Sequence, residues 1–405
     1  VDIYKPLIFS NISLNLTNTL STKHKKDNGI FFSHPKIVKQ TIREICKYNI
    51  SVKNILEPSC GSCEFISHIT AIYPNASIDG VEYDETIYNT IKHFSENKVT
   101  IYNKDFLSFH TDKMYDLIIG NPPYFVIKKK DCPKKYHKYL EGRPNIYLLF
   151  ILQCLEMLSE NGILAFILPN NFLNCSYYQK VRNHIDENFT ILNIIDCKNG
   201  FIDTDQPTHI IFIQNKKPVN NTLFTLKITN NIIFNTEDKI NQLKSLYKNS
   251  HTLDNLGFHV SVGKVVWNQV KDTLTTDNTK TLLIYSSDIK NNSLEPCKYK
   301  DPSKKNYIEI DGLTGPLLVV NRGYGKGKYT FNYCLIDIDK SYQIENHLIC
   351  IEPTIDMDKE ELLDTYNKII KSFNQSKTKE FVDLYCSNDA MNTTELQYVL
   401  PIYMF

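Results

Sequence analysis

The chain has almost no net charge and no long apolar run. Its 46 Lys and Arg residues are balanced by 45 Asp and Glu residues, which leaves a formal net charge of +1 over 405 residues. No uniform positive field marks the surface, so any nucleic-acid-binding surface must come from local clusters of Lys and Arg. No apolar run reaches the length that a membrane-spanning helix needs, and we therefore expect no membrane partner.

Paired cysteine motifs are also missing. The 11 cysteines are odd in number and scattered, and no signal-peptide pattern precedes them, which predicts free thiols in a reducing compartment. Cys60 and Cys63 form a C-x-x-C pair, but no second pair follows at zinc spacing, so we expect packed thiols and no metal site. The single tryptophan, Trp267, is expected to pack in the core of a second domain.

The order of the expected elements divides the chain. Residues 1–28 are polar and mixed and predict a surface arm. Residues 29–216 alternate strands with helices, which indicates an α/β domain with a Rossmann-like sheet. Residues 217–405 lose this alternation and predict a separate α+β domain. In the first domain we expect helices at 36–47, 64–72, 146–158 and 177–188, and strands at 52–56, 77–82, 99–102, 115–120, 163–168, 191–196 and 206–214.

A short loop, Asn121-Pro122-Pro123-Tyr124, follows the apolar run Tyr115–Gly120. Two prolines cannot continue a strand ladder, so the loop leaves the sheet at the carboxyl end of a strand, where open α/β sheets bind ligands. The loop offers an amide, a proline carbonyl and an aromatic face. Together these groups suit a planar ring that carries an exocyclic amino group, such as adenine.

Two further strand ends carry polar groups. The strand at 52–56 runs into Glu57-Pro58-Ser59-Cys60-Gly61-Ser62-Cys63 and then a helix, the opening of a nucleotide-binding unit, although it lacks the G-x-G-x-x-G pattern. Glu82 ends the next strand about 20 residues later, where dinucleotide-binding folds place a ribose-binding carboxylate. Taken singly, Glu82 and Asp105 are better explained as solvated acids at strand ends, but taken together they are not.

The order of these motifs resembles the N6-adenine DNA methyltransferases of the amino-methyltransferase type, in the gamma arrangement and the TaqI-like branch. The resemblance spans nearly the whole chain after about residue 28. It implies a Rossmann-like catalytic domain dependent on S-adenosylmethionine, followed by an α+β target-recognition domain. The matching motifs are G-I-F-F-S-H-P at 29–35, L-E-P-S-C-G at 56–61, G-V-E at 80–82, K-D-F at 104–106, N-P-P-Y at 121–124, N-I-Y-L-L-F at 145–150 and N-G-I-L-A-F-I-L-P at 161–169.

The resemblance also assigns roles in cofactor binding. Glu57 would hold the methionine ammonium, with Pro58 and Cys60 shaping the turn. Glu82 would accept hydrogen bonds from the ribose hydroxyls, and Asp105 from the adenine amino group. Other implied cofactor contacts are Phe31, Ser33 (where the family often has Thr), Phe106, Asn121 and Phe150. Cys63 stands where a glycine is common in this family.

The implied reaction is transfer of a methyl group to the N6 amino group of adenine. That group is hidden in a duplex, so the base must be flipped out. Asn121 and the Pro122 carbonyl would accept its hydrogens and aim its lone pair, while Pro123 stiffens the loop. Tyr124 would stack on the base, and Phe201 would supply a second aromatic contact, although loop packing explains Phe201 equally well.

The expected partner is double-stranded DNA, bound by a monomer, and a separately encoded restriction endonuclease is a second partner that the resemblance allows. We expect the DNA contacts to come from Lys128, Lys129 and Lys130 beside the catalytic loop, and from Arg322, Tyr324, Lys326 and Lys328 in the second domain. The protein is expected in the cytoplasm, or wherever its target DNA resides. Two alternatives stay open: methylation of an RNA base or a protein glutamine amide, and a non-catalytic nucleic-acid-binding module.

Overall fold

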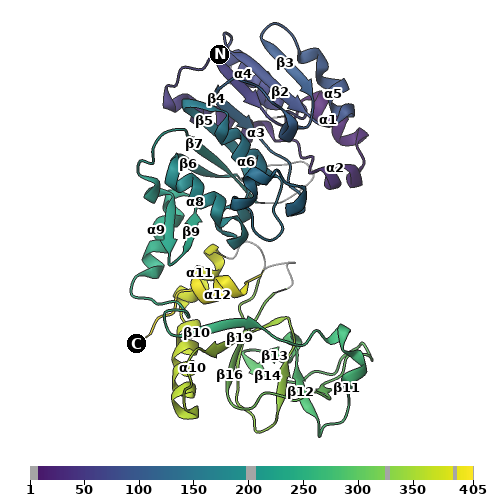
Figure 1. Cartoon of the computed structure of the whole chain (residues 1–405), viewed down its shortest axis with the longest axis vertical. Coiled ribbons are helices and arrows are strands. Elements are labelled where there is room, and N and C mark those ends of the chain that lie inside the picture. Colours follow the sequence, from purple (N-terminus) through teal and green to yellow (C-terminus); the bar gives the residue numbers. More distant parts are fainter. Residues whose placement is uncertain (1–7, 198–206, 324–328, 386–389, 405) are drawn as a thin grey trace. The chain divides into compact units, whose positions relative to one another are not determined.

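The computed structural model describes residues 8–197, 207–323, 329–385 and 390–404 (Figure 1). The chain forms two compact units. The first comprises Val1–Leu226 and Ile232–Ile240, and the second comprises Lys227–Asn231 and Asn241–Phe405. The first unit thus continues past the expected boundary at 216/217, because Phe224, Ile232 and Phe234 are buried in its core.

A seven-stranded sheet forms the centre of the first unit, in the order β3-β2-β1-β4-β5-β7-β6. β7 is antiparallel to its two neighbours, and the other strand pairs are parallel. This sheet confirms the predicted Rossmann-like α/β class. The strands are β1 (Asn54–Glu57), β2 (Ser77–Glu82), β3 (Val99–Asn103), β4 (Tyr115–Gly120), β5 (Leu158–Pro169), β6 (Thr190–Cys197) and β7 (Thr208–Gln214).

Both faces of this sheet are covered by helices, and the side chains of each strand alternate between two cores. On β4, Leu117 and Ile119 are buried with residues of α3 and α4, whereas Ile118 is buried with residues of α6 and α8. Strands covered on both faces are apolar throughout, which explains the uninterrupted apolar run before Asn121. The helices are α3 (Pro35–Ile45), α4 (Glu64–Ile72), α5 (Glu85–Ile91), α6 (Tyr147–Glu156), α7 (Asn171–Asn174) and α8 (Gln179–Asn188).

The N-terminal segment is not the surface arm that its polar composition suggested. It folds as α1 (Asn11–Thr19) and α2 (Thr22–Asn28), and Leu16 and Leu20 are buried in the core of the first unit. Its polar side chains are paired, since the Ser13 hydroxyl donates to Glu64 Oε1 at 2.5 Å and the Ser10 backbone N–H donates to the same oxygen at 3.0 Å. These contacts fix α1 against the start of α4.

A two-stranded sheet of β8 (Thr225–Ile228) and β9 (Asn231–Phe234), followed by α9 (Glu237–Tyr247), has residues in both units. The second unit contains two four-stranded sheets. One has the order β10-β19-β16-β17 and the other β11-β15-β12-β18. Their strands are β10 (Phe258–Val262), β11 (Leu274–Thr275), β12 (Thr281–Ile284), β15 (Tyr307–Ile308), β16 (Leu317–Asn321), β17 (Tyr333–Ile336), β18 (Tyr342–Ile344) and β19 (Leu348–Pro353); the hairpin β13 (Ile289–Lys290) and β14 (Ser293–Leu294) completes the set.

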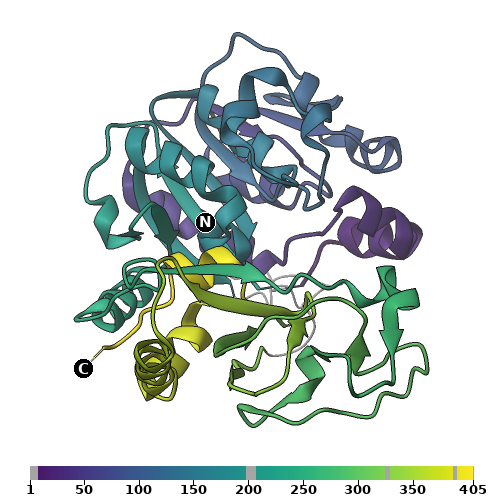
Figure 2. The ribbon, with the colours of Figure 1, turned by 60° about the horizontal axis from the view of Figure 1, so that its bottom comes forward.

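Three helices accompany these strands, α10 (Lys359–Phe373), α11 (Ser376–Tyr385) and α12 (Thr393–Tyr398), and α12 packs against β10 (Figure 2). Trp267 was expected inside this core, but it is half-buried at the margin of a small cluster that includes Val265 and Tyr285. No helix in the described part of the chain is long and apolar enough to cross a membrane.

Candidate active site

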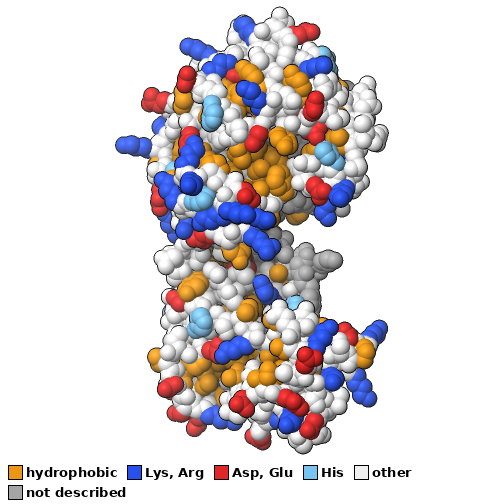
Figure 3. All heavy atoms as spheres, turned by 45° about the vertical axis from the view of Figure 1, so that its right-hand side comes forward, with side chains coloured by type: hydrophobic (Ala, Val, Ile, Leu, Met, Phe, Trp, Pro, Cys, Tyr) orange, Lys and Arg blue, Asp and Glu red, His pale blue; other side chains and the backbone are white. Residues whose placement is uncertain are grey.

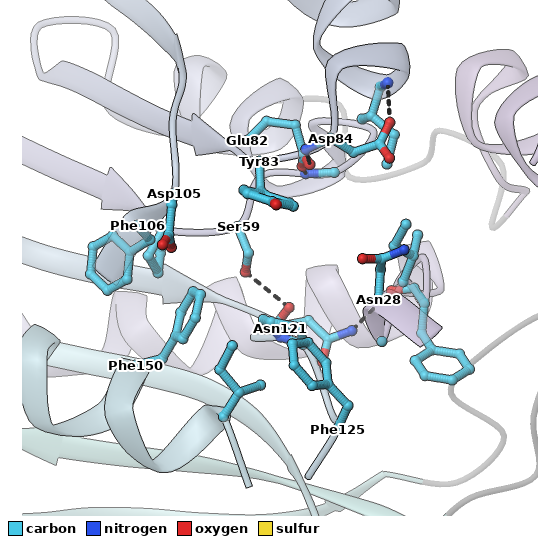
Figure 4. A pocket seen from close by; sticks show the side chains of 18 of the residues that line it. Asn28, Ser59, Glu82, Tyr83, Asp84, Asp105, Phe106, Asn121, Phe125 and Phe150 are labelled. Atoms are coloured by element: carbon cyan, nitrogen blue, oxygen red, sulfur yellow. Dashed lines mark hydrogen bonds between the residues drawn. The ribbon is translucent and has the colours of Figure 1, made fainter. Parts of the chain in front are cut away.

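A pocket of about 360 Å³ opens at the carboxyl ends of β1 and β4 (Figure 4). These two strands are neighbours in the sheet, but the chain proceeds from β1 to one side and from β4 to the other. Such a reversal leaves a crevice beyond the strand ends, which is where open α/β sheets bind ligands. Pro58 and Ser59 enter the pocket after β1, and Asn121 and Pro123 enter it after β4.

The turn after β1 places the start of α4 beside the pocket. Cys63 caps this helix in the left-handed conformation, with φ +60° and ψ +31°, and its side chain is fully buried. A glycine adopts this conformation without steric cost, whereas a Cβ is crowded there. The Cys60 backbone N–H donates to the Val81 carbonyl at 2.9 Å, which joins the turn to β2.

Glu82, at the end of β2, points its carboxylate at this turn. Its Oε2 accepts from the Gly61 backbone N–H at 2.9 Å, and its Oε1 accepts from the Asp84 backbone N–H at 2.8 Å. Burial raises the pKa of Glu82 to about 7, against the lowering effect of these backbone donors. A carboxylate with fixed oxygens and remaining lone pairs can accept hydrogen bonds from a vicinal diol.

Glu57 is buried beneath the pocket and does not line it. Burial raises its pKa well above the usual range, and the nearby Cys63 adds to this effect. Within the described residues, the buried Glu57 Oε2 atom has no hydrogen-bond partner. A buried oxygen without a hydrogen-bond donor is costly. Glu57 Oε2 therefore indicates a bound cation or a hydrogen-bond donor that the described residues do not provide.

Aromatic side chains form an apolar wall of the pocket. Phe106 and Phe150 both line it, and their ring centroids are 4.8 Å apart. Asp105 is exposed at the rim and accepts from the Leu107 backbone N–H at 3.0 Å. A planar ring bound against these phenylalanines would have a carboxylate at its edge (Figure 4).

The amide of Asn121 has a defined orientation. Its Nδ2 donates to the Phe31 carbonyl at 3.0 Å, which makes Oδ1 the acceptor of the Tyr124 hydroxyl. Its backbone carbonyl accepts from Ser59 Oγ at 3.1 Å, which joins the Asn121–Tyr124 loop to the turn after β1 (Figure 4). No described residue donates a hydrogen bond to the Pro122 carbonyl.

Tyr124 lies beside the pocket and does not line it. Its hydroxyl is also within 2.8 Å of the Ile167 carbonyl, and its ring packs edge-on against Tyr147 with centroids 5.9 Å apart. On its other side it lies parallel to Phe31, with 28° between the ring planes and 6.3 Å between centroids. The loop is therefore held by hydrogen bonds and by ring contacts at once.

The N-terminal helices supply a rim that sequence reasoning missed. Asp27, Asn28 and Gly29 line the pocket, and His24 Nε2 lies 2.6 Å from Asp84 Oδ2, next to Glu82. Tyr83, which is 70% exposed, and Phe125 also line it. Tyr83 directly follows Glu82, and Phe125 directly follows Tyr124. This adjacency to expected site residues is the sequence signal that could have identified them.

We expect Gly29→Ala to disturb the catalytic loop. Gly29 has φ +64°, and a Cβ there would lie 2.6 Å from the Tyr124 backbone nitrogen. Because backbone must move, we expect a loss of more than about 2 kcal/mol in the free energy of unfolding and a clear fall in turnover. Denaturant titration and a methyl-transfer assay measure both.

Gly257→Ala is the matched control. Gly257 has φ +78°, but its added Cβ would meet nothing closer than Thr354 Oγ1 at 3.7 Å. It should lose about 1–2 kcal/mol of stability through backbone strain alone and keep its turnover. Equal effects of the two substitutions on turnover would contradict the role given to the close approach at Gly29.

The structure brings most of the expected cofactor residues to one pocket. Those that line it are Phe31, Pro58, Glu82, Asp105, Phe106, Asn121 and Phe150. Ser33 and Cys60 are buried and do not line the pocket, because Ser33 precedes α3 and the Cys60 thiol packs near Gly80. Phe201 lies outside the described residues.

The basic residues expected at the DNA are described only in part. Lys128, Lys129 and Lys130 are exposed just after the catalytic loop, and Lys129 Nζ donates to the Leu140 carbonyl at 2.8 Å. Figure 3 shows Lys and Arg side chains on the same face of the first unit as a gathering of hydrophobic side chains. Arg322 is exposed in the second unit, whereas Tyr324, Lys326 and Lys328 lie outside the described residues.

Known proteins match the chain over nearly its whole length. The family model described as Eco57I restriction-modification methylase matches residues 36–202. The type II methyltransferase M.CvrRI of Paramecium bursaria Chlorella virus XZ-6E is 30% identical over 405 residues, which cover 98% of this chain and 99% of the relative. The chain belongs to the N6-adenine-type DNA methyltransferase family. The modification methylase CviBIII of Paramecium bursaria Chlorella virus NC1A is 29% identical over 408 residues, with coverage of 98% and 99%.

A solved structure supports the fold of this family member. A chain of a DrdV–DNA complex superposes on this chain with a TM-score of 0.52 at 13% identity. The match covers 92% of this chain and 55% of that chain. At this identity the likeness shows the fold alone. The family resemblance predicted from the motifs, and with it S-adenosylmethionine as the cofactor, is confirmed by these type II methyltransferase relatives.

Proposed function

We propose that this methyltransferase acts on the N6 amino group of adenine in duplex DNA, at a specific sequence, after flipping the base out of the helix. The observation that carries the proposal is the position of Asn121. Its amide lines the same pocket as Glu82, Phe106 and Phe150, so the amino-group acceptor and the cofactor contacts face one volume.

We propose the following cofactor contacts. Glu82 accepts from the ribose hydroxyls, Phe106 and Phe150 contact the adenine, and Asp105 accepts from its amino group. Glu57 is buried and does not line the pocket, so contact with the methionine ammonium requires its carboxyl group to reach into the pocket. That contact would give the orphaned Oε2 a donor and favour the ionised form of a carboxyl group whose pKa is raised by burial. S-adenosylmethionine supplies an activated methyl group on a sulfonium, and the protein supplies orientation.

The target amino group is a poor nucleophile, because its lone pair is delocalised into the purine. Hydrogen bonds from its two hydrogens to Asn121 Oδ1 and to the Pro122 carbonyl would favour tetrahedral geometry at nitrogen. The Phe31 carbonyl fixes the amide in the orientation that leaves Oδ1 as acceptor, and the Pro122 carbonyl accepts from no described residue. The amide is therefore oriented before the base arrives, and electrostatic stabilisation needs no reorganisation of it.

Stacking on the flipped base is assigned to Tyr124, with Phe201 as the second aromatic contact. The Tyr124 hydroxyl donates to Asn121 Oδ1. When the base enters, its amino group either replaces this hydrogen bond or donates to the second lone pair of Oδ1. Pro123 keeps the loop rigid during this exchange. Both stacking roles remain predictions.

Comparison of three substrate classes tests the proposal. Purified protein and labelled S-adenosylmethionine are incubated with unmethylated duplex DNA, with RNA of the same sequence and with glutamine-containing peptides. We expect transfer to duplex DNA alone, by a monomer that needs no endonuclease partner. Preferred transfer to RNA or to peptide would contradict the proposal and would show that the Asn121–Tyr124 loop acts on one of the alternative substrates.

A second prediction concerns Arg322. It is exposed at the end of β16, and its backbone N–H donates to the His347 carbonyl at 3.1 Å. Changing Arg322 and Lys326 to Ala should weaken DNA binding about tenfold, while cofactor affinity stays unchanged. The slope of log affinity against log salt concentration should become shallower by about one to two. DNA titrations at several salt concentrations measure this, and unchanged DNA binding would exclude this segment from the interface.

A further inference from the structure

A group of aromatic and basic side chains in the second unit lies outside the segments considered so far. The Lys304 Nζ atom lies 4.0 Å from the ring centroid of Tyr285, 4.3 Å from that of Tyr299 and 5.9 Å from that of Trp267. Lys271 Nζ lies 5.5 Å from the Trp267 centroid. We refer to these five residues as the aromatic–lysine surface.

A buried carboxylate holds the two tyrosines of this surface. Asp288 is 1% exposed, and both of its oxygens lie 2.7 Å from the Tyr299 hydroxyl. The same carboxylate accepts from the backbone N–H groups of Tyr285, at 2.9 Å, and Cys297, at 2.8 Å. The Tyr285 hydroxyl donates to the Lys305 carbonyl at 2.9 Å. The positions of Tyr285 and Tyr299 are thus set by buried hydrogen bonds of the fold.

The two ammonium groups keep their charge available. Among the described residues, neither Lys271 nor Lys304 forms an ion pair with a carboxylate. The pKa of Asp301 is lowered mainly by hydrogen bonds from Ser303 and to a smaller extent by these two lysines. An aromatic face attracts an ammonium without consuming a hydrogen-bond donor, so both groups retain N–H donors for an anion.

We propose that the aromatic–lysine surface binds the phosphate backbone of duplex DNA, with Lys271 and Lys304 contacting phosphates and Trp267 packing against the sugar between them. This inference rests on the proposed function, because it assumes that DNA is the substrate. The chemistry is that of nucleic-acid surfaces, where unpaired cations contact phosphates and aromatic rings pack on sugars and bases. Trp267 is half-buried and Lys271 is exposed, so both are accessible.

The only tryptophan of the chain provides the measurement. We expect selectively excited tryptophan fluorescence of the full-length protein to change on addition of a duplex oligonucleotide and to follow the same titration curve as DNA binding. Lys271→Gln and Lys304→Gln should each weaken DNA binding about fivefold near 0.15 M salt and lower the salt slope by about 0.9. Lys377→Gln is the matched control, because it removes a charge 5.3 Å from the Tyr403 ring elsewhere in this unit.

The outcomes separate this inference from the proposed function. If the wild type binds and methylates duplex DNA, but neither lysine variant changes affinity or salt slope more than Lys377→Gln, the surface does not bind DNA. An acidic peptide that changes the fluorescence while duplex DNA does not would identify a protein partner and overturn the inference. If the wild type methylates RNA or peptide only, the proposed function fails instead. Variants are checked by thermal unfolding and by cofactor binding, which the first unit provides.

Discussion

Replacing Asn121 with Ala should lower the rate of methyl transfer by at least about 100-fold, because it removes a preorganised acceptor at the reacting nitrogen. The fold should survive. Asn121 is half-exposed and its side chain makes one hydrogen bond to the Phe31 carbonyl and one to Tyr124, so we expect to lose about 1–2 kcal/mol of unfolding free energy. Single-turnover kinetics with DNA and bound cofactor measure the chemical step directly.

Asn54→Ala is the matched control for this prediction. The Asn54 Nδ2 atom donates to the Met114 carbonyl at 3.2 Å, at the amino end of β1 and thus at the opposite edge of the same sheet. This substitution should cost similar stability and leave turnover unchanged. If Asn121→Ala retains near wild-type turnover, or if both variants lose activity equally, Asn121 does not act on the amino group.

Cofactor affinity should depend on pH through Glu82. Burial raises the pKa of this carboxyl group from its ordinary value of 4.5 to about 7, and only the ionised form can accept from two ribose hydroxyls. Below about pH 7 we expect affinity for S-adenosylmethionine to fall by up to about tenfold per pH unit. Since the folded state holds this proton more tightly than the unfolded state, the contribution of Glu82 to stability declines as pH rises from about 4.5 to about 7.

Calorimetric titration of S-adenosylmethionine binding between about pH 5 and about pH 8, with the wild type and with Glu82→Gln, tests this. The variant should bind the cofactor at least about tenfold more weakly above pH 7, and the number of protons linked to binding should fall by one. Glu57→Gln is the companion variant, because burial also raises the pKa of Glu57 well above its ordinary value. An unchanged pH profile in Glu82→Gln would show that Glu82 does not meet the ribose.

The sequence was sufficient where an element has a strong local signal. The strands expected at 77–82 and 115–120 and the helix expected at 64–72 are found as β2, β4 and α4 with the same bounds. The clustering of the expected cofactor residues at the ends of β2, β3 and β4 was predictable because parallel strands end at one edge of a sheet. Glu82, Asp105 and Asn121 accordingly line one pocket.

The rest depends on contacts between distant segments. α1 and α2 are polar, and their burial requires partners such as Glu64 and Asp84 that a local pattern does not contain. The left-handed conformation of Cys63 has no local sequence signal, because glycine and asparagine are the residues that usually predict one. Only the family resemblance, in which a glycine is common at this position, points to it. The sequence also could not show that the side chains of Glu57 and Tyr124 do not line the pocket. Burial and hydrogen bonding to distant segments set the directions of these side chains.

Identification of the methylated nucleoside tests the central claim most directly. Duplex DNA treated with the protein and labelled S-adenosylmethionine is digested to nucleosides, which are separated and compared with standards. The geometry around Asn121 predicts label in N6-methyladenine alone, at one sequence context, and none with Asn121→Ala. Label in N4-methylcytosine or 5-methylcytosine, or label in adenine that persists in the Asn121→Ala variant, would contradict it.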